Sequence, residues 1–372
     1  RGSANYEKRD YDAAVADFDQ ALKLNADYTL AYYNRGLAYR DKADFDRAIA
    51  DFSQVARLDP KQVHALANRG LAQRMKGDMA RAIADFDLAL KIDVKFALAY
   101  YHRGITNGLK GDIDRAIADF DQAVRFDPQN ALAFNNRGFA YRTKDDAERA
   151  IADFDQAVKL NPNYDVAYSN RGNVYYEKRD YERAIQNFTQ AIKINPNNPL
   201  AYNSRGLAYD DRRDSEAAIA DFDQAIKIRP NYAVAFNNRG FAYRGFGDRN
   251  KAIADFDQAI KLNAGYALAY YNRGIAYYDK RDYERATGDL NQAIKLNPNY
   301  AQAFHDRGVA YYDKRDYDTA IPERDPAIKV EPTYLVALSA PSGVFENKRD
   351  DSRPSQGIIP SIKPDQLQAI AT

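Results

Sequence analysis

Side-chain amides recur along this chain at a fixed spacing. Asparagine stands at one place in a 34-residue period at Asn34, Asn68, Asn136, Asn170, Asn238 and Asn272. An asparagine amide carries both a donor and an acceptor, so one side chain can bind the C=O and the N–H of one peptide unit together. Asparagine is an ordinary-to-poor helix former and adds no apolar area, so helix stability does not explain its repetition. The series therefore predicts a ladder of amides that reads an extended peptide backbone without requiring a particular sequence.

Neighbouring positions extend this predicted peptide site. When each repeat is numbered from the equivalent of Thr29, the asparagines are at the sixth position. The fifth position carries Tyr33, Tyr101, Asn135, Asn203, Asn237 and Tyr271. The ninth position carries Leu37, Ile105, Phe139, Leu207, Phe241 and Ile275. Together these residues predict a groove with amide clamps, apolar pockets and little charge.

A basic clamp for an acidic peptide terminus is not expected from the second position of the repeat. The residues there are Leu30, His64, Leu98, Leu132 and Val166, not lysine.

The period itself is clearest in pairs of arginine and glycine. They run in steps of 34 residues from Arg35-Gly36 to Arg307-Gly308, and Arg1-Gly2 lies one period earlier. A fixed period of this size indicates a stack of identical supersecondary units. Such a solenoid grows by adding units and needs no central core, so the length of 372 residues does not imply several globular domains.

Each repeat has the pattern of two helices joined by a short turn. In the first complete repeat, Gly36 and Tyr39 fall on one face of a predicted helix, and Asp44 is placed to cap the next helix. Phe52 belongs to the apolar face of that second helix, and Pro60 follows its end. Small residues such as Gly36 are expected to let the two helices approach closely.

This order of residues resembles the tetratricopeptide repeat: aromatic, glycine, tyrosine, alanine, phenylalanine, alanine, proline. One complete set is Phe134, Gly138, Tyr141, Ala150, Phe154, Ala157 and Pro162, and the repeats at Tyr168 and Tyr202 are also complete. The resemblance covers about residues 1–334. The departures from it include Gln73 and Asn107 in place of the tyrosine, and Val94 and Ala264 in place of the proline.

The resemblance implies an all-α, right-handed superhelical solenoid of antiparallel helix pairs. It also implies that the first helices line a concave face, which places the asparagine ladder inside the groove. The ladder is similar to one in the superhelix of O-linked N-acetylglucosamine transferases. This chain carries no glycosyltransferase domain, so only the binding groove is carried over. The alternative interpretation is that asparagine is usual at this position in the family and binds no ligand.

The arginine before each glycine stands where the family usually has an apolar residue. A partly buried guanidinium needs a charge partner. An aspartate in the second helix of the same repeat is the natural candidate, in the series Asp51, Asp85, Asp119, Asp153, Asp221, Asp255 and Asp289. The two series therefore predict structural ion pairs and not a cation site. Asn187 interrupts the aspartates, so Arg171 must find another partner or remain solvated.

Composition excludes several functions. The net charge is +1 with acids and bases interleaved, so no basic face for nucleic acid is expected. The chain has no cysteine, and its three histidines, His64, His102 and His305, occupy different repeat positions. Neither a metal site nor a catalytic constellation is indicated, so we expect no enzyme, no catalytic residue and no cofactor. No apolar run approaches the ~20 residues of a membrane span. The compartment is not indicated, although the composition slightly favours the cytoplasm over a periplasmic or extracellular location.

The pattern predicts residues 1–334 as the solenoid, with a truncated first repeat and nine further repeats. Residues 335–372 are predicted to be a degenerate tenth repeat and an irregular tail. Pro322 and Pro326 fall inside the second helix of the ninth repeat and are expected to distort or break it. The final segment, Pro354–Thr372, is open to interpretation as a degenerate cap, a flexible tail or an error in the sequence.

These features favour a non-enzymatic scaffold that binds a protein or peptide, extended or helical, in its groove. Two alternatives stay open. One is a structural protein that assembles head to tail into a filament, because near-identical repeats can stack across molecules. The other is a targeting module of a larger protein, because the sequence starts in the middle of a repeat.

Overall fold

The computed structural model describes residues 1–320, and within them every regular element is a helix. First and second helices of successive repeats alternate along the chain. The first helices are α1 (Gly2–Glu7), α3 (Thr29–Asp41), α5 (Val63–Met75), α7 (Ala97–Leu109), α9 (Ala131–Thr143), α11 (Asp165–Glu177), α13 (Pro199–Asp211), α15 (Ala233–Phe246), α17 (Ala267–Asp279) and α19 (Ala301–Asp313). The second helices are α2 (Tyr11–Leu24), α4 (Phe45–Leu58), α6 (Met79–Ile92), α8 (Ile113–Phe126), α10 (Ala147–Leu160), α12 (Tyr181–Ile194), α14 (Ser215–Ile228), α16 (Arg249–Leu262), α18 (Tyr283–Leu296) and α20 (Tyr317–Ala320).

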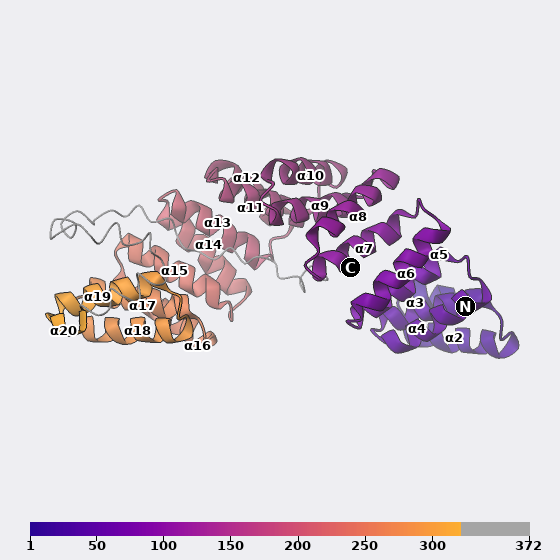
Figure 1. Cartoon of the computed structure of the whole chain (residues 1–372), viewed down its shortest axis with the longest axis horizontal. Helices are drawn as coiled ribbons and strands as arrows, with labels where there is room; N and C mark the ends of the chain where they lie inside the picture. The colour runs from indigo at the N-terminus through magenta and orange to yellow at the C-terminus, as the bar shows by residue number, and fades with distance from the viewer. Residues whose placement is uncertain (321–372) are drawn as a thin grey trace. The chain divides into compact units, whose positions relative to one another are not determined.

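The described chain forms two compact units, residues 1–174 and residues 175–320, with the boundary inside α11. Within each unit the helices follow one another in chain order, and each first helix lies beside the second helix of its repeat (Figure 1). The predicted all-α fold of repeated antiparallel helix pairs is therefore confirmed. The predicted solenoid end at residue 334, the two prolines and the degenerate tail lie outside the described residues.

A three-residue turn reverses the chain inside each repeat, and its middle residue is left-handed. The backbone φ is +59° at Ala43 and +95° at Gly77, and each equivalent residue in the described repeats also has a positive φ. The next residue caps the second helix: Asp44 accepts a hydrogen bond from the backbone N–H of Arg47 at 3.2 Å. This is the capping role that the sequence predicts for Asp44. Because so short a turn joins consecutive helices, they must run antiparallel.

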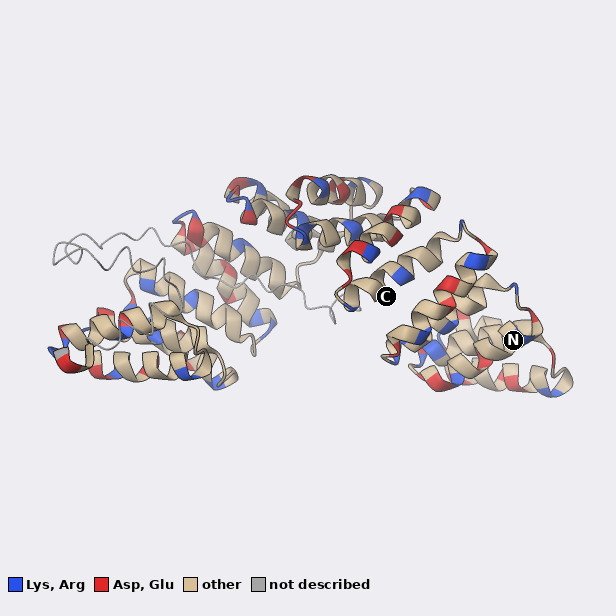
Figure 2. Ribbon diagram, viewed as in Figure 1, with Lys and Arg blue, Asp and Glu red and all other residues tan. Residues whose placement is uncertain are grey.

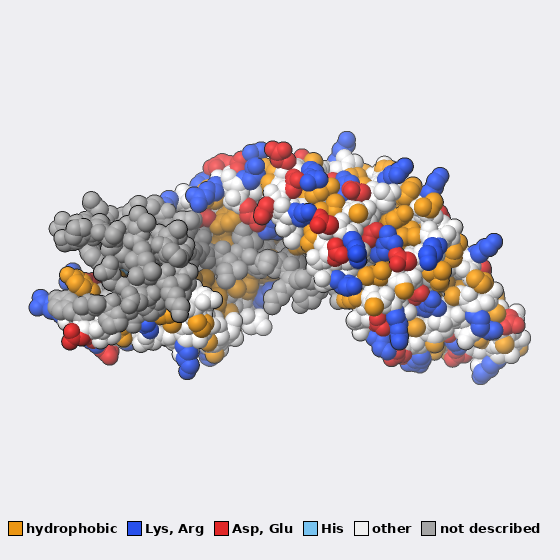
Figure 3. Space-filling view, in the orientation of Figure 1, with side chains coloured by type: hydrophobic (Ala, Val, Ile, Leu, Met, Phe, Trp, Pro, Cys, Tyr) orange, Lys and Arg blue, Asp and Glu red, His pale blue; other side chains and the backbone are white. Residues whose placement is uncertain are grey.

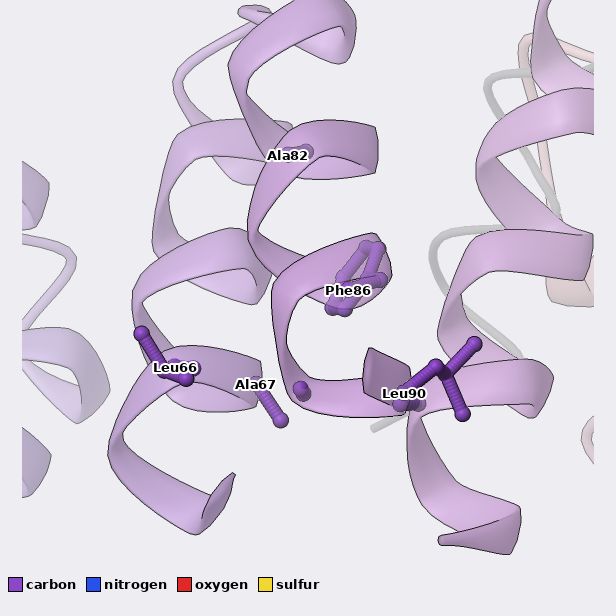
Figure 4. Packing of buried hydrophobic residues seen from close by; sticks show 7 residues of the cluster. Leu66, Ala67, Ala82, Phe86 and Leu90 are labelled. Atoms are coloured by element: carbon purple, nitrogen blue, oxygen red, sulfur yellow. The ribbon is translucent and has the colours of Figure 1, made fainter. Parts of the chain in front are cut away.

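The two helices of a repeat touch at the glycine of the first helix. A Cβ added to Gly36 would lie 2.8 Å from Cε1 of Phe52, a side chain that is fully buried. The second helix then packs against the next repeat, so the core is a series of small clusters. In one of them Leu66 comes from α5 and Phe86 from α6 (Figure 4), and Ala99 comes from α7 of the next repeat. Each repeat thus lacks a complete core of its own, as expected for a solenoid.

Two glycines of α7 offer a matched test of this contact. We expect Gly104→Ala to destabilise the protein by about 1–3 kcal/mol, because its Cβ would lie 2.8 Å from Cε1 of Phe120, which is 4% exposed. Gly108→Ala is the control, because its Cβ would lie 3.8 Å from the nearest side chain. It should be neutral or stabilise by up to about 1 kcal/mol through helix propensity. Urea unfolding followed by circular dichroism checks both, and equal effects would contradict the proposed contact.

Candidate functional site

The asparagine ladder joins the first helices of neighbouring repeats. The sixth residue of one repeat donates to the fifth residue of the preceding repeat, 35 positions earlier. Asn170 Nδ2 donates to Asn135 Oδ1 at 3.0 Å, and Asn136 Nδ2 donates to the Tyr101 hydroxyl at 3.1 Å. The same bond links Asn238 to Asn203, Asn272 to Asn237 and Asn68 to Tyr33. The structure thus brings the predicted site residues together as pairs that tie repeat to repeat.

Most of these amides are buried. Asn135, Asn203 and Asn237 are 0–1% exposed, and Asn136, Asn170, Asn238 and Asn272 are 1–7% exposed. Tyr101 and Tyr271 are also buried, and the Tyr271 hydroxyl donates to Asp306 Oδ2 at 2.7 Å. Both amide groups act within the protein at Asn135, Asn136, Asn237 and Asn238. A group without a hydrogen-bond partner remains at Asn170 Oδ1 and at Asn203 Nδ2.

The first two rungs of the ladder are more open. Tyr33, Asn34 and Asn68 are all half-buried. Asn68 is held by three bonds, because its Nδ2 also donates to the His64 carbonyl at 2.8 Å and Arg40 Nη1 donates to its Oδ1 at 2.5 Å. Asn34 makes no side-chain hydrogen bond to another described residue.

The apolar positions of the predicted groove divide into two kinds. At the second position, Leu30 is 54% exposed and Leu98 and Leu132 are each 37% exposed. At the ninth position, Ile105 and Leu207 are only 2% exposed and fill the helix interface. The second position therefore offers more apolar area to a ligand than the ninth.

The predicted ion pairs are present. Arg137 Nε and Nη2 donate to the two carboxylate oxygens of Asp153 at 2.8 and 2.7 Å. The same two-bond pairing joins Arg35 to Asp51, Arg69 to Asp85, Arg103 to Asp119, Arg205 to Asp221, Arg239 to Asp255 and Arg273 to Asp289. Burial raises the pKa of the Asp153 carboxyl, against the opposing effect of the Arg137 guanidinium. The interpretation of these charges as structural is confirmed.

Each arginine also reaches a third helix, which the sequence analysis did not predict. Arg137 Nη1 donates to Asp121 in the second helix of the preceding repeat at 2.8 Å. Arg171, which faces Asn187 in the pattern, uses this second route and pairs with Asp155. The sequence contains a signal for this second pairing. The aspartate of the preceding repeat lies 16 residues before the arginine, and the paired aspartate of its own repeat lies 16 residues after it.

Charged residues of both signs occur along the described helices (Figure 2). Acidic and basic residues alternate along the helices (Figure 2), and the face in Figure 3 shows apolar and charged side chains interspersed. Among the described residues, no group of histidine, aspartate and glutamate side chains is arranged to hold a metal ion. No helix in this part of the chain is long and apolar enough to cross a membrane.

Comparisons with known proteins agree with the repeat pattern. Family models described as TPR repeat or tetratricopeptide repeat together match residues 2–93 and 109–300. No curated protein sequence matches the chain.

Solved structures share the fold. A tetratricopeptide repeat protein from Parabacteroides merdae is 19% identical, with 67% of this chain and 98% of that chain covered and a TM-score of 0.52. Cut9–Hcn1, described as a hetero-tetramer of APC/C, is 13% identical, with 93% and 95% covered and the same TM-score of 0.52. YrrB, described as a TPR protein with an unusual peptide-binding site, is 26% identical, with 50% of this chain and 97% of that chain covered and a TM-score of 0.42.

Removing one arginine tests the ion pairs. We expect Arg137→Leu to cost about 3–5 kcal/mol, because it leaves the Asp153 carboxylate, whose side chain is 7% exposed, without its main partner. Arg171→Leu is the control and should cost clearly less. Its partner Asp155 is 55% exposed, and the neutral Asn187 stands where the other repeats have the buried aspartate.

The same pair of variants has a pH dependence of definite sign. Loss of Arg137 leaves the pKa of Asp153 raised by burial in the folded state, so ionisation of Asp153 destabilises the fold as pH rises. The deficit of Arg137→Leu should therefore be full at pH 7 and shrink as pH falls toward the ordinary aspartate value of about 3.9. Urea unfolding of both variants at several pH values provides the measurement. A deficit that is the same at every pH would count against a buried, unpaired Asp153.

Proposed function

Since the chain belongs to the tetratricopeptide repeat family of protein-interaction scaffolds, we propose that it holds a peptide segment of a partner protein against its first helices. The peptide lies across the fifth, sixth and twelfth positions of successive repeats. Its backbone meets the unpaired groups of the ladder residues Asn170 and Asn203, and its apolar side chains meet the leucines of the second position. The function is binding, without catalysis.

One observation carries this proposal: buried polar atoms without a hydrogen-bond partner are confined to the first helices and the residue just before them. In the described chain these atoms belong to Gln73, Arg74, His102, Tyr164, Ser169, Asn170, Asn173, Asn203, Tyr232 and Tyr266. The second helices contribute no such atom among the described residues. Buried polar groups are normally satisfied, so each exception calls for an explanation. A ligand on the first-helix face would supply one for the fifth-, sixth- and twelfth-position atoms, whereas Gln73 faces the turn and the second helices.

The ladder amides show how such a ligand would bind. Asn170 uses its Nδ2 to hold Asn135, and its Oδ1 is left without a donor. Asn203 uses its Oδ1 to accept from Asn238, and its Nδ2 is left without an acceptor. A peptide unit carries one N–H and one C=O and so matches the two kinds of open group. Recognition of this kind depends on the backbone and tolerates many sequences.

A second candidate is end-to-end association of the chain, and one observation favours it. Leu24 at the end of α2 is 90% exposed, whereas the equivalent residues Ile92, Leu262 and Leu296 are 36–39% exposed. Tyr28 and Leu30 extend the same apolar surface. A repeat stacked on this end, from a second copy, would cover all three residues.

The peptide proposal is tested with residues matched in type and exposure. Heptapeptides are selected from a random displayed library on the whole chain, and their Kd is measured by fluorescence anisotropy. We expect Leu98→Ser combined with Leu132→Ser to weaken binding at least fivefold, because both leucines are 37% exposed on first helices. Leu88→Ser is the control, because Leu88 is 42% exposed on the second helix α6. A Kd that is unchanged in the Leu98→Ser and Leu132→Ser double variant would refute the proposal. A library that yields no binder would also refute it.

Light scattering over a concentration series tests end-to-end association. If the exposed end of α2 binds a second copy, the average mass should rise with concentration, and Leu24→Asp should abolish the rise by placing a charge in the contact. A mass that stays at 42.1 kDa at high concentration would eliminate this candidate.

A further inference from the structure

One basic side chain in the described chain is buried and unpaired. Arg74, the twelfth residue of its repeat in α5, is 2% exposed, and its Nε and Nη1 atoms have no hydrogen-bond partner. The seventh-position arginines differ, because each donates to a carboxylate or a polar side chain of a second helix. A buried cation without a partner is costly and is rarely kept without a purpose.

The missing partner can be identified from the other repeats. In several repeats the residue at the twelfth position donates to an aspartate at the thirteenth position of the next repeat, as at Tyr6, Tyr176, Arg244 and Tyr278. Arg244 Nε donates to Asp279 Oδ2 at 2.5 Å, and the Tyr6 hydroxyl donates to Asp41 at 2.6 Å. For Arg74 the thirteenth position of the next repeat is Leu109, which packs on the apolar core of its repeat. At this point in the array the twelfth position carries a cation, but the thirteenth position of the next repeat carries no acid.

The described surroundings of Arg74 supply no carboxylate. Among the described residues, Tyr101 is the one titratable group that acts on Arg74, and burial lowers the pKa of Arg74 to about 10, so it remains charged at neutral pH. Next to it His102 is 8% exposed, and its Nδ1 is also without a partner. Burial and the nearby Arg74 and Arg40 charges lower the pKa of His102 to about 3, so the imidazole is neutral. Arg40 itself is occupied by Asp41 and Asn68.

We propose that Arg74 binds a carboxylate of the partner peptide, with His102 as a neutral polar neighbour, at a fixed point on the first-helix face. The inference rests on the proposed peptide-binding function and names the chemistry of one contact within it. A guanidinium presents its donors in pairs to the two oxygens of a carboxylate, as Arg35 does to Asp51. One buried positive charge beside a neutral imidazole matches the single negative charge of a carboxylate. A phosphate dianion would remain half unneutralised.

Arg74 is 2% exposed, whereas other residues at the twelfth position are more open. Tyr312 at this position is 52% exposed, and Tyr6 and Arg244 are half-buried. The carboxylate comes from an aspartate or glutamate side chain or from the carboxy terminus of the partner. The apolar second position, with leucine in place of lysine, does not oppose this assignment, because the cation is supplied by the twelfth position.

The first experiment probes the arginine directly with acetate. The Nε–H resonance of Arg74 is assigned in the whole chain by its loss in Arg74→Gln. It is then followed while sodium acetate replaces sodium chloride at constant ionic strength. We expect a saturable shift of this resonance in the native chain. The Arg244 resonance is the internal control and should not move, because Asp279 already occupies that guanidinium. An Arg74 resonance that does not respond to acetate overturns the proposal.

A second variant keeps the test valid if Arg74→Gln does not fold. Leu109→Asp restores the acid that other repeats have at the thirteenth position, so it should pair with Arg74 and abolish the acetate response. Leu109→Asn, which removes the same apolar side chain without adding charge, should keep the response. An acetate shift that persists in Leu109→Asp contradicts the proposal.

Peptides then distinguish the source of the carboxylate and separate this inference from the proposed function. Three fluorescein-labelled forms of one selected peptide are compared: a free carboxy terminus, an amidated terminus, and an amidated terminus with one internal glutamate. We expect one carboxylate form to bind at least tenfold more tightly than the neutral form, and this advantage to disappear in Leu109→Asp. Equal binding of all three forms, still weakened by Leu98→Ser and Leu132→Ser, would refute the carboxylate contact and leave the peptide-binding function standing.

Discussion

The guanidinium at the seventh position is the interaction on which the stack depends. It lies between two second helices, because the side chain of Arg137 bonds to Asp153 of its own repeat and to Asp121 of the preceding one. Both partners are 16 residues away, so the contact works only if each repeat has the same length. A single insertion would separate the arginine from one of its acids. The fixed 34-residue period is therefore a geometric requirement of this bridge as well as of the packing.

The glycine beside the arginine sets the distance at which the bridge can form. Because Gly36 lets Phe52 approach the backbone of the first helix, Arg35 can reach both aspartates while its guanidinium lies over the rings of Tyr32 and Tyr39. Apolar packing alone would allow small slips between the helices. The two-bond geometry of the ion pair opposes such slips, because a guanidinium and a carboxylate must meet in one plane.

The sequence predicted the features that repeat and did not predict those that depend on a neighbouring repeat. The helix pairs, the Asp44 cap, the close approach at Gly36 and the pairing of arginine with aspartate all follow from patterns within one period. The left-handed turn residue was missed, because Ala43 and most of its equivalents are not glycine. The bonds of Asn170 to Asn135 were missed for a different reason. Whether a side chain lies in an open groove or between two helices depends on how far one repeat rotates against the next, and no single repeat encodes that rotation.

The candidate site lies where the pattern fails. The sequence already marked Gln73 and Asn107 as departures, and the same two repeats contain Arg74 and Leu109, where other repeats have a bonded pair. Asn107 is satisfied, because its Nδ2 donates to Asp119 at 2.9 Å, so that change is absorbed by the fold. Arg74, in contrast, has no hydrogen-bond partner for its Nε and Nη1 atoms. Among the described buried groups without a hydrogen-bond partner, Arg74 is the one cation, and a ligand is its most direct explanation. In this solenoid, residues that depart from the repeat pattern therefore indicate where a ligand binds, whereas residues that follow the pattern stabilise the fold.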